Sequence, residues 1–381
     1  MKWKQAAGLL LATVMLLATL SACGREDADP VHAVLGYSGD TTFFTVNGEA
    51  ITAEDYLLWL VQEIEYINNY YVSMGYPGVD WNEDLDGITA KAYLKEQAKE
   101  TAKLVAIMRQ TAEAAGFRYE NTDAVSYDED RARVIEEQGG QESYERYLLE
   151  MCMTDRSMER INRSNILYRK MLDGLFSPGG EYAPSDASIA EELAARNVLR
   201  AKHILLLTAE ANLDAQPYSD VKIAEQRALA SQLLSLIQTS DNPVDTFEVL
   251  MREYSEDTGL AANPDGYVFT TAPDGTLFTS RMVEEFEQGT QALHIGQISG
   301  IVESKYGLHI ILRLDPLEDE AFMQRFLASW SSQRLDQMIQ EAMNSATVET
   351  TSAFETLDAQ GFYEKLLNYR VHLSGGGTTS E

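Results

Sequence analysis

The stretch NVLRAKHILLL (197–207) opens a segment that continues with YSEDTG (254–259) and MVEEFE (282–287) and closes with GQISGIVESKYGLHIILRL (296–314). Two histidines, His203 and His309, therefore sit in short apolar runs. An acidic turn containing Asp257 and the pair Met282 and Phe286 lie between them. We expect these side chains to meet at one small pocket, with a His–His–Asp hydrogen-bond network over an apolar floor.

The chain is strongly acidic. Its 60 Asp and Glu residues against 30 Lys and Arg give a formal charge of −30 over 381 residues. That balance argues against a nucleic-acid partner. It suits a protein that must stay soluble while it handles aggregation-prone chains. The length predicts two or three domains. No Cys/His spacing for zinc and no Gly-rich phosphate loop is visible, so we expect no metal and no cofactor.

The first residues are typical of a secretory signal. A basic start (Lys2, Lys4) precedes an apolar run from Ala6 to Leu20 that is too short to span a membrane comfortably. Leu20-Ser21-Ala22-Cys23 then resembles a bacterial lipobox, which implies cleavage before Cys23 and lipidation of its thiol. An ordinary signal peptide with an incidental Cys is the alternative. The remaining Cys152, in YLLEMCM, has no partner for an internal disulfide and is expected to be a buried small hydrophobe.

Composition divides the rest of the chain into segments. Residues 1–22 are the expected signal and 23–42 a polar spacer. Residues 43–196 are expected to form a helical domain, with a strand at Phe43–Val46, a turn at Asn47-Gly48 and a helix capped by Thr52 and Asp55. Further helices are predicted at about 89–115, 126–138, 141–176 and 185–196. We expect residues 316–347 to provide a C-terminal helix that packs on this domain. We expect 348–381 to form a partly disordered tail, with a strand or short helix near Phe354–Leu367.

Residues 197–315 have a different pattern. We predict strands over VLRAKHILLL, 298–302 and 308–314, with helices at about 220–239, 245–254 and 283–288. Strands and helices mixed in about 118 residues indicate a compact α+β domain with a small antiparallel sheet.

At these residues the sequence resembles the parvulin family (PpiC type) of peptidyl-prolyl isomerases. The whole layout is similar to PrsA-type foldase lipoproteins and, more distantly, to SurA-type chaperones. The TVNGEAIT segment (45–52) resembles the start of those chaperones. The resemblance implies a parvulin-like domain joined to an all-helical chaperone-like domain built from N-terminal and C-terminal segments.

Position by position, the resemblance assigns two sets of residues. The catalytic set is His203, Asp257, His309, Ser255 and Ser304, and the proline-binding set is Met282, Phe286 and Phe269. His32, His294 and His372 match nothing. Three features depart from the family: NPDGYVF (263–269) replaces the usual glycine-rich loop, TTAPDGTLFTSR (270–281) is a lengthened connection, and Tyr306 stands where some relatives carry a small residue.

The implied chemistry needs no cofactor. Amide resonance sets a rotation barrier of about 18–20 kcal/mol, and X-Pro bonds populate both isomers. An isomerase has only to bind the twisted amide better than either planar form. Met282 and Phe286 would hold the proline ring, and Asp257 would disfavour the planar, charge-separated amide near the rotating carbonyl.

Two functions remain open at this point. The first is a peptidyl-prolyl cis-trans isomerase and foldase that acts on exported proteins with X-Pro bonds, anchored by lipid at Cys23 to the extracytoplasmic face of the cell membrane. The second is an extracytoplasmic chaperone whose parvulin-like domain is catalytically weak or inactive, with Tyr66, Tyr70, Tyr71, Tyr76 and Trp81 as an aromatic surface. A purely structural lipoprotein leaves the ordered His/Asp/Met/Phe set unexplained. The sequence leaves the oligomeric state open, a homodimer included.

Overall fold

The computed structural model describes residues 29–210, 216–271 and 282–374. The chain forms two compact units, one made of the residues up to Tyr182 together with those from Ser332 onward, and the other of Ala183–Ser331. The expected signal peptide, Cys23 and part of the 270–281 connection lie outside the described residues. Across the described ranges, no helix combines the length and apolar character needed to cross a membrane.

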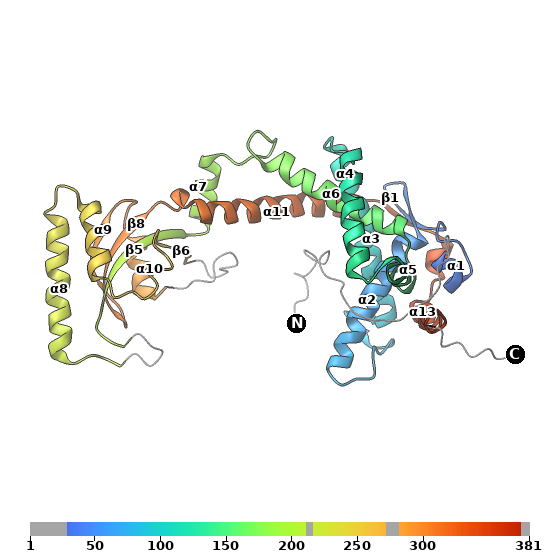
Figure 1. The fold of residues 1–381 in the computed structure, drawn as a ribbon, viewed down its shortest axis with the longest axis horizontal. Coiled ribbons are helices and arrows are strands. Elements are labelled where there is room, and N and C mark those ends of the chain that lie inside the picture. The colour runs from blue at the N-terminus through green and yellow to red at the C-terminus, as the bar shows by residue number, and fades with distance from the viewer. Residues whose placement is uncertain (1–28, 211–215, 272–281, 375–381) are drawn as a thin grey trace. The chain divides into compact units, whose positions relative to one another are not determined.

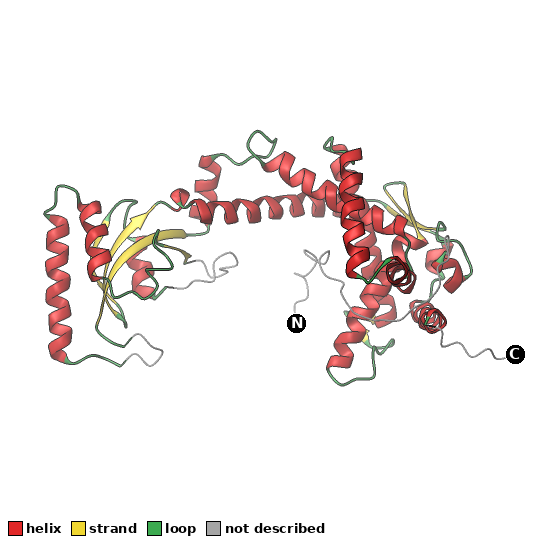
Figure 2. Cartoon of the chain, viewed as in Figure 1, coloured by secondary structure: helices red, strands yellow, loops and turns green. Residues whose placement is uncertain are grey.

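The first unit is mainly helical (Figures 1 and 2) and has two small sheets, β2-β1-β9 and β3-β4. Its elements are α1 (Pro30–Leu35), β1 (Thr42–Val46), β2 (Glu49–Thr52), α2 (Ala53–Ser73), β3 (Asp84–Leu85), β4 (Ile88–Thr89), α3 (Ala90–Ala114), α4 (Asn121–Glu137), α5 (Gln141–Glu150), α6 (Asp155–Phe176), the end of α11 (Glu320–Ser345), β9 (Val348–Thr350), α12 (Ser352–Glu355) and α13 (Ala359–Leu373).

The beginning of α2 agrees with the sequence-based prediction. Asn47 and Gly48 take positive φ values in the turn between β1 and β2, a conformation that Asn and Gly tolerate best. Thr52 and Asp55 then form a reciprocal capping box. The strand β1 is central in the order β2-β1-β9, so the unit joins chain segments about 300 residues apart. Phe43 and Phe44 of β1 pack against Tyr56 and Phe354, edge to face in every pair except the tilted pair Phe43–Tyr56.

Three local expectations in this unit differ from the structure. The spacer contains α1, because Asp29 caps its first turn, Pro30 begins it and Val31 is fully buried. The helix expected over 141–176 is interrupted between α5 and α6, where Cys152 has a φ of 57°. In the C-terminal tail, the short helix that the sequence allowed near 354–367 is longer than expected: it is α13, whose apolar face includes the buried Phe362 and Leu366.

The second unit contains an antiparallel sheet in the order β6-β5-β8-β7. Its elements are α7 (Asp186–Ala195), β5 (Val198–Leu207), α8 (Asp220–Gln238), α9 (Pro243–Tyr254), β6 (Tyr267–Thr270), α10 (Glu284–Gln291), β7 (Ile298–Glu303), β8 (Gly307–Leu314), the 3-10 turn η1 (Pro316–Glu318) and the start of α11. The predicted α+β class with a small antiparallel sheet is confirmed; β6 was not expected from the sequence.

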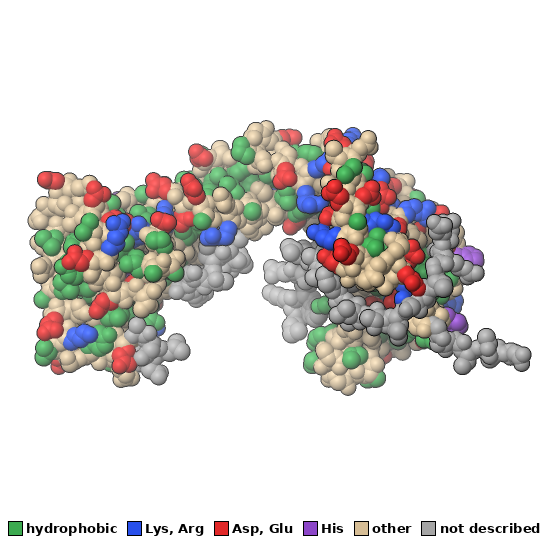
Figure 3. Space-filling view, viewed as in Figure 1, with side chains coloured by type: hydrophobic (Ala, Val, Ile, Leu, Met, Phe, Trp, Pro, Cys, Tyr) green, Lys and Arg blue, Asp and Glu red, His purple; other side chains and the backbone are tan. Residues whose placement is uncertain are grey.

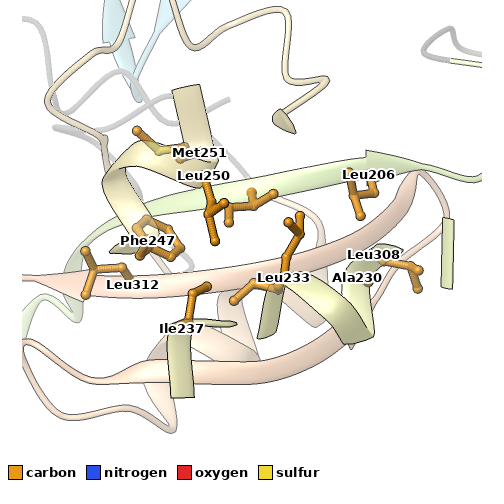
Figure 4. Packing of buried hydrophobic residues seen from close by; sticks show 11 residues of the cluster. Leu206, Ala230, Leu233, Ile237, Phe247, Leu250, Met251, Leu308 and Leu312 are labelled. Atoms are coloured by element: carbon orange, nitrogen blue, oxygen red, sulfur yellow. The ribbon is translucent and has the colours of Figure 1, made fainter. Parts of the chain in front are cut away.

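Alternation along β5 and β8 gives this sheet two buried faces. One face carries Ile204, Leu206 and Ile310 and packs under α8 and α9 together with Phe247 (Figure 4). The opposite face carries Leu199, Ala201 and Ile311 and packs against Phe286 of α10. His203 and His309 have the same parity as this second set, so their side chains emerge on the α10 side of the sheet.

Candidate active site

The two predicted histidines meet at the centre of the sheet. In the β5–β8 register His203 lies opposite Ile311 and His309 lies opposite Leu205, so the two rings occupy neighbouring positions on one face. Their Nδ1 atoms are 2.9 Å apart. The ring centroids are 5.2 Å apart and the ring planes differ by 10°. Because the N–N separation accounts for most of the centroid distance, the rings meet edge to edge through a hydrogen bond.

This hydrogen bond continues at both ends. Asp257 Oδ2 lies 3.1 Å from His203 Nε2, and Ser304 Oγ lies 2.7 Å from His309 Nε2. A carboxylate only accepts, so His203 Nε2–H donates to Asp257. With both rings neutral, His309 Nδ1–H donates to His203 and the Ser304 hydroxyl donates to His309. All four groups are thus satisfied by one proton arrangement, assigned from the network.

Asp257 is held by three donors. Besides His203, the Tyr267 hydroxyl donates to Oδ2 at 2.6 Å and the Gly259 N–H donates to Oδ1 at 2.9 Å. Partial burial raises the pKa of Asp257, but the hydrogen bonds from His203, Tyr267 and Gly259 outweigh it and lower the pKa to about 2. The carboxylate is therefore ionised at neutral pH.

Burial lowers the pKa of His309, whereas it raises that of a carboxyl group. His309 is 3% exposed, and its burial, together with the neighbouring His203, lowers its pKa to about 3 in spite of the attraction of Asp257. Burial and the hydrogen bond to Asp257 hold the pKa of Tyr267 well above its ordinary value. At pH 7 the hydrogen-bonded network thus combines an ionised Asp257 with a neutral His309.

The apolar part of the site comes from α10 and the residue before it. Phe286 is 2% exposed, and its ring contacts His203 and His309 with centroid distances of 5.0 and 5.6 Å. Met282 is half-buried against the same cluster. A pocket of about 590 Å³ opens here, lined by His203, Leu205, Asp257, Tyr267, Met282, Val283, Glu284, Glu285, Phe286, Lys305, Tyr306 and His309.

Three predicted site residues do not line this pocket. Ser304 supports His309 from behind. Ser255 accepts a hydrogen bond from the Leu205 N–H and contacts the His203 carbonyl, so it holds β5 instead of facing the cavity. Phe269 is fully buried beneath Phe286, with ring centroids 5.6 Å apart, and is support for the pocket floor instead of a wall.

The sequence pattern missed several lining residues. Glu284 and Glu285 lie inside the MVEEFE motif, and Tyr306 directly precedes the strand of His309. Their position next to predicted site residues was the one sequence feature that could have indicated them. Tyr267 follows Gly266 in NPDGYVF and is placed by β6, which was not predicted. Among the residues described, no group of three or more His, Cys, Asp or Glu side chains could hold a metal ion.

Comparison with known proteins agrees with this geometry. Residues 203–315 match the family model described as "Rotamase: PPIC-type PPIASE domain". The chain is 31% identical over 124 residues to the "Foldase protein PrsA" of Geobacillus sp. (strain WCH70), a match covering 32% of this chain and 34% of the relative. It is 24% identical over 253 residues to that of Staphylococcus aureus (strain N315), covering 65% and 72%.

Among solved structures, PrsA from Bacillus cereus aligns over 75% of this chain and 98% of its own, with 16% identity and a TM-score of 0.28. The first of these relatives is matched over about a third of its own length. Residues 203–315 are similar to PPIC-type parvulin domains, and the matched parts of the chain are similar to PrsA foldases.

Proposed function

We propose that the chain is a peptidyl-prolyl cis-trans isomerase that assists the folding of other proteins. The proposal depends on one observation: the Ser304–His309–His203–Asp257 network ends in a carboxylate at the rim of a pocket floored by Phe286. A hydrogen-bonded network that ends in an ionised carboxylate, over an apolar floor, suits a reaction in which no bond forms or breaks. The Ser304 hydroxyl donates to His309 but does not line the pocket, so it is not placed to attack a bound peptide.

The free-energy requirement is modest. A ten-thousandfold acceleration needs about 5.5 kcal/mol of preferential binding to the twisted amide. The flat ring of Phe286 and the thioether of Met282 can hold a pyrrolidine ring, which leaves the preceding carbonyl free to rotate. Loss of water around the amide favours the twisted form, since the planar amide is the more polar of the two.

Asp257 supplies the electrostatic part. Its negative charge disfavours electron density on a nearby carbonyl oxygen, and so opposes the resonance that keeps the amide planar. The carboxylate has this charge across the physiological pH range because its pKa is about 2. His203 and His309 would act as its fixed, buried support.

The test is an NMR exchange assay on X-Pro peptides with the full chain. We expect turnover that falls at least tenfold in Asp257→Asn and in Phe286→Ala. Asp241→Asn is the matched control, because Asp241 is exposed in the loop between α8 and α9. Unchanged turnover in both site variants, or no turnover in the wild type, would reject the isomerase.

We further propose that the chain works on exported proteins outside the cytoplasmic membrane, held by lipid on Cys23. The support is the Leu20-Ser21-Ala22-Cys23 sequence after an apolar run. Mass spectrometry of the N-terminal peptide from membrane fractions should find a diacylglyceryl Cys23. Release of a Cys23→Ser chain into the soluble fraction is expected; an unmodified Cys23 in the mature protein contradicts the anchor. Analytical ultracentrifugation distinguishes a monomer from a homodimer.

A specific surface favours chaperone activity as a second function. The end of α2 and the loop after it carry apolar side chains between 47% and 62% exposed: Tyr66, Tyr70, Val72, Met74 and Tyr76. We call these five residues the α2 tip. Tyr71 contacts both Tyr70 and Tyr76, so the tip is continuous. Exposed apolar patches of this kind are typical of binding surfaces.

The charge around the α2 tip indicates which kind of unfolded segment it would bind. Residues 26–90 contain no Lys or Arg, whereas Asp80, Glu83, Asp84 and Asp86 follow the tip in sequence. Acidic side chains are also spread over the visible face of the molecule (Figure 3). An unfolded segment with basic and apolar residues is therefore the complementary client, through cation–π contacts with the tyrosines.

An aggregation assay with a basic unfolded client tests this second function. Tyr66→Ser/Tyr70→Ser/Tyr76→Ser should weaken suppression of aggregation and leave X-Pro turnover unchanged, because the α2 tip and the pocket belong to different units. Val125→Ser/Tyr182→Ser/Val221→Ser is the control, since these side chains are 44% to 70% exposed elsewhere. Equal losses in both triple variants would exclude the tip. A deletion of residues 197–315 that kept full suppression would make chaperoning the main activity.

A further inference from the structure

Tyr267 is the pocket residue most closely tied to Asp257. Its hydroxyl donates to Asp257 Oδ2 at 2.6 Å, a shorter contact than the 3.1 Å from His203 Nε2 to the same oxygen. Its ring also stands edge-on to the His203 ring, with centroids 5.8 Å apart and an interplanar angle of 86°. Tyr267 therefore touches both members of the His203–Asp257 pair.

The neighbouring backbone is shaped to allow this contact. Gly259 donates its N–H to Asp257 Oδ1 at 2.9 Å, and a Cβ atom at Gly259 would overlap the Tyr267 hydroxyl oxygen. Any larger residue at this position would force the hydroxyl away from the carboxylate. A glycine at position 259 thus permits both hydrogen bonds: its own N–H donates to Asp257 Oδ1, and the Tyr267 hydroxyl donates to Oδ2.

We propose that Tyr267 is a positioning residue for the isomerase reaction, and that its hydroxyl fixes the carboxylate plane of Asp257 against His203. This inference rests on the proposed isomerase function. The Gly259 N–H on Oδ1 and the His203 Nε2–H on Oδ2 already restrain rotation about the Cβ–Cγ bond of Asp257. The Tyr267 hydroxyl adds a second and shorter hydrogen bond to Oδ2, which narrows the remaining range of orientations of the carboxylate. The phenol supplies a hydrogen bond to an ionised acceptor, which is among the stronger kinds.

The kinetic test is a double-mutant cycle in the full chain. Tyr267→Phe keeps the ring in the pocket and removes only the hydroxyl. We expect kcat for an X-Pro peptide to fall about tenfold, the effect of losing about 1.4 kcal/mol of transition-state stabilisation, with KM unchanged. In an Asp257→Asn background the same substitution should have little further effect, because Tyr267 acts through Asp257. Additive losses in the cycle would overturn the proposal, as would full kcat in the single variant.

A second readout does not depend on activity. The carboxyl ¹³C signal of Asp257 should titrate near pH 2 in the wild type and about one unit higher in Tyr267→Phe, since a tenfold change in affinity for the proton is one pKa unit. The other titratable groups that line the pocket are His203, His309, Glu284, Glu285, Lys305 and Tyr306. They are unchanged in the variant. An unshifted midpoint would show that the hydroxyl does not hold the carboxylate.

Matched substitutions separate positioning from general stability. Tyr254→Phe removes a hydroxyl from α9, whose residues pack on the opposite face of the sheet, and should preserve kcat and the Asp257 titration. Gly259→Ala should reproduce the kinetic loss of Tyr267→Phe, because it displaces the same hydroxyl. If the wild type shows no turnover, the isomerase proposal fails, while the titration still decides whether Tyr267 holds Asp257.

Discussion

The buried His309 predicts an unusual dependence of stability on pH. In the folded chain its pKa is lowered from 6.5 to about 3, first by burial and then by His203. As the pH falls from about 6.5 toward 3, His309 is therefore protonated in the unfolded chain but stays neutral in the folded chain. The contribution of neutral His309 is complete above pH 6.5 and is lost progressively below it.

The magnitude follows from the interval between the two pKa values. At pH 4.5, two units below the unfolded value, the loss is about 3 kcal/mol at about 1.4 kcal/mol per unit. That is a large part of the 5–15 kcal/mol typical of a folded domain. Asp257 adds little to the loss between pH 7 and pH 4.5, because its depressed pKa places its own loss of stability below about pH 4.

The assay is urea unfolding of the full chain at pH 7 and pH 4.5, followed through the methyl signals of Ile310 and Ile311, which report the two faces of the sheet. His309→Gln removes the titrating group. We expect the wild type to lose about 3 kcal/mol more than this variant between the two pH values. His294→Gln, at an exposed position, should behave as the wild type. Equal losses in the wild type and His309→Gln would refute the reasoning.

Two substitutions and one labelling experiment test packing. Phe286→Ala should lower the free energy of unfolding of the second unit by about 3–5 kcal/mol, measured by urea titration, with Phe286→Leu losing less. Gly307→Ala should destabilise by about 1–3 kcal/mol, because its Cβ would overlap the Leu206 carbonyl oxygen and lie 2.9 Å from Leu207 Cα; an unchanged melting temperature would contradict that contact. In a Cys23→Ser chain, Cys152 should react with a thiol reagent only on unfolding, since it is fully buried and burial raises its thiol pKa; rapid labelling of the native chain would contradict this.

The site was predictable from sequence where short-range pattern and chain order sufficed. The strands of His203 and His309 and the helix of Phe286 follow from apolar runs, and the family resemblance aligned their side chains. The roles of Ser255 and Phe269 were not accessible, because a motif match does not distinguish a residue that lines a cavity from one that supports it. Tyr267 was missed because its four-residue strand depends on pairing with β5, a tertiary contact.

The fold shows the same division between local and distant causes. The Thr52 cap and the Asn47-Gly48 turn are local signals and were predicted. The helix α1 has equally local signals in Asp29 and Pro30, but its six residues are too few for a visible periodicity. The helix α13 is held by packing against other helices of its unit, which the sequence alone does not show. Without that packing, its polar residues are typical of a disordered tail.

The pairing of β1 with β9 has a consequence for biosynthesis. Phe44 emerges early from the ribosome, whereas its partner Thr350 is made some 300 residues later. The second unit, by contrast, has all its strands between Val198 and Leu314. A nascent chain that has reached only residue 347 would therefore contain every strand of the β6-β5-β8-β7 sheet, yet leave an unpaired edge on β1. The first unit can complete its sheet only after β9 is made, so the edge of β1 stays exposed while the whole second unit is translated.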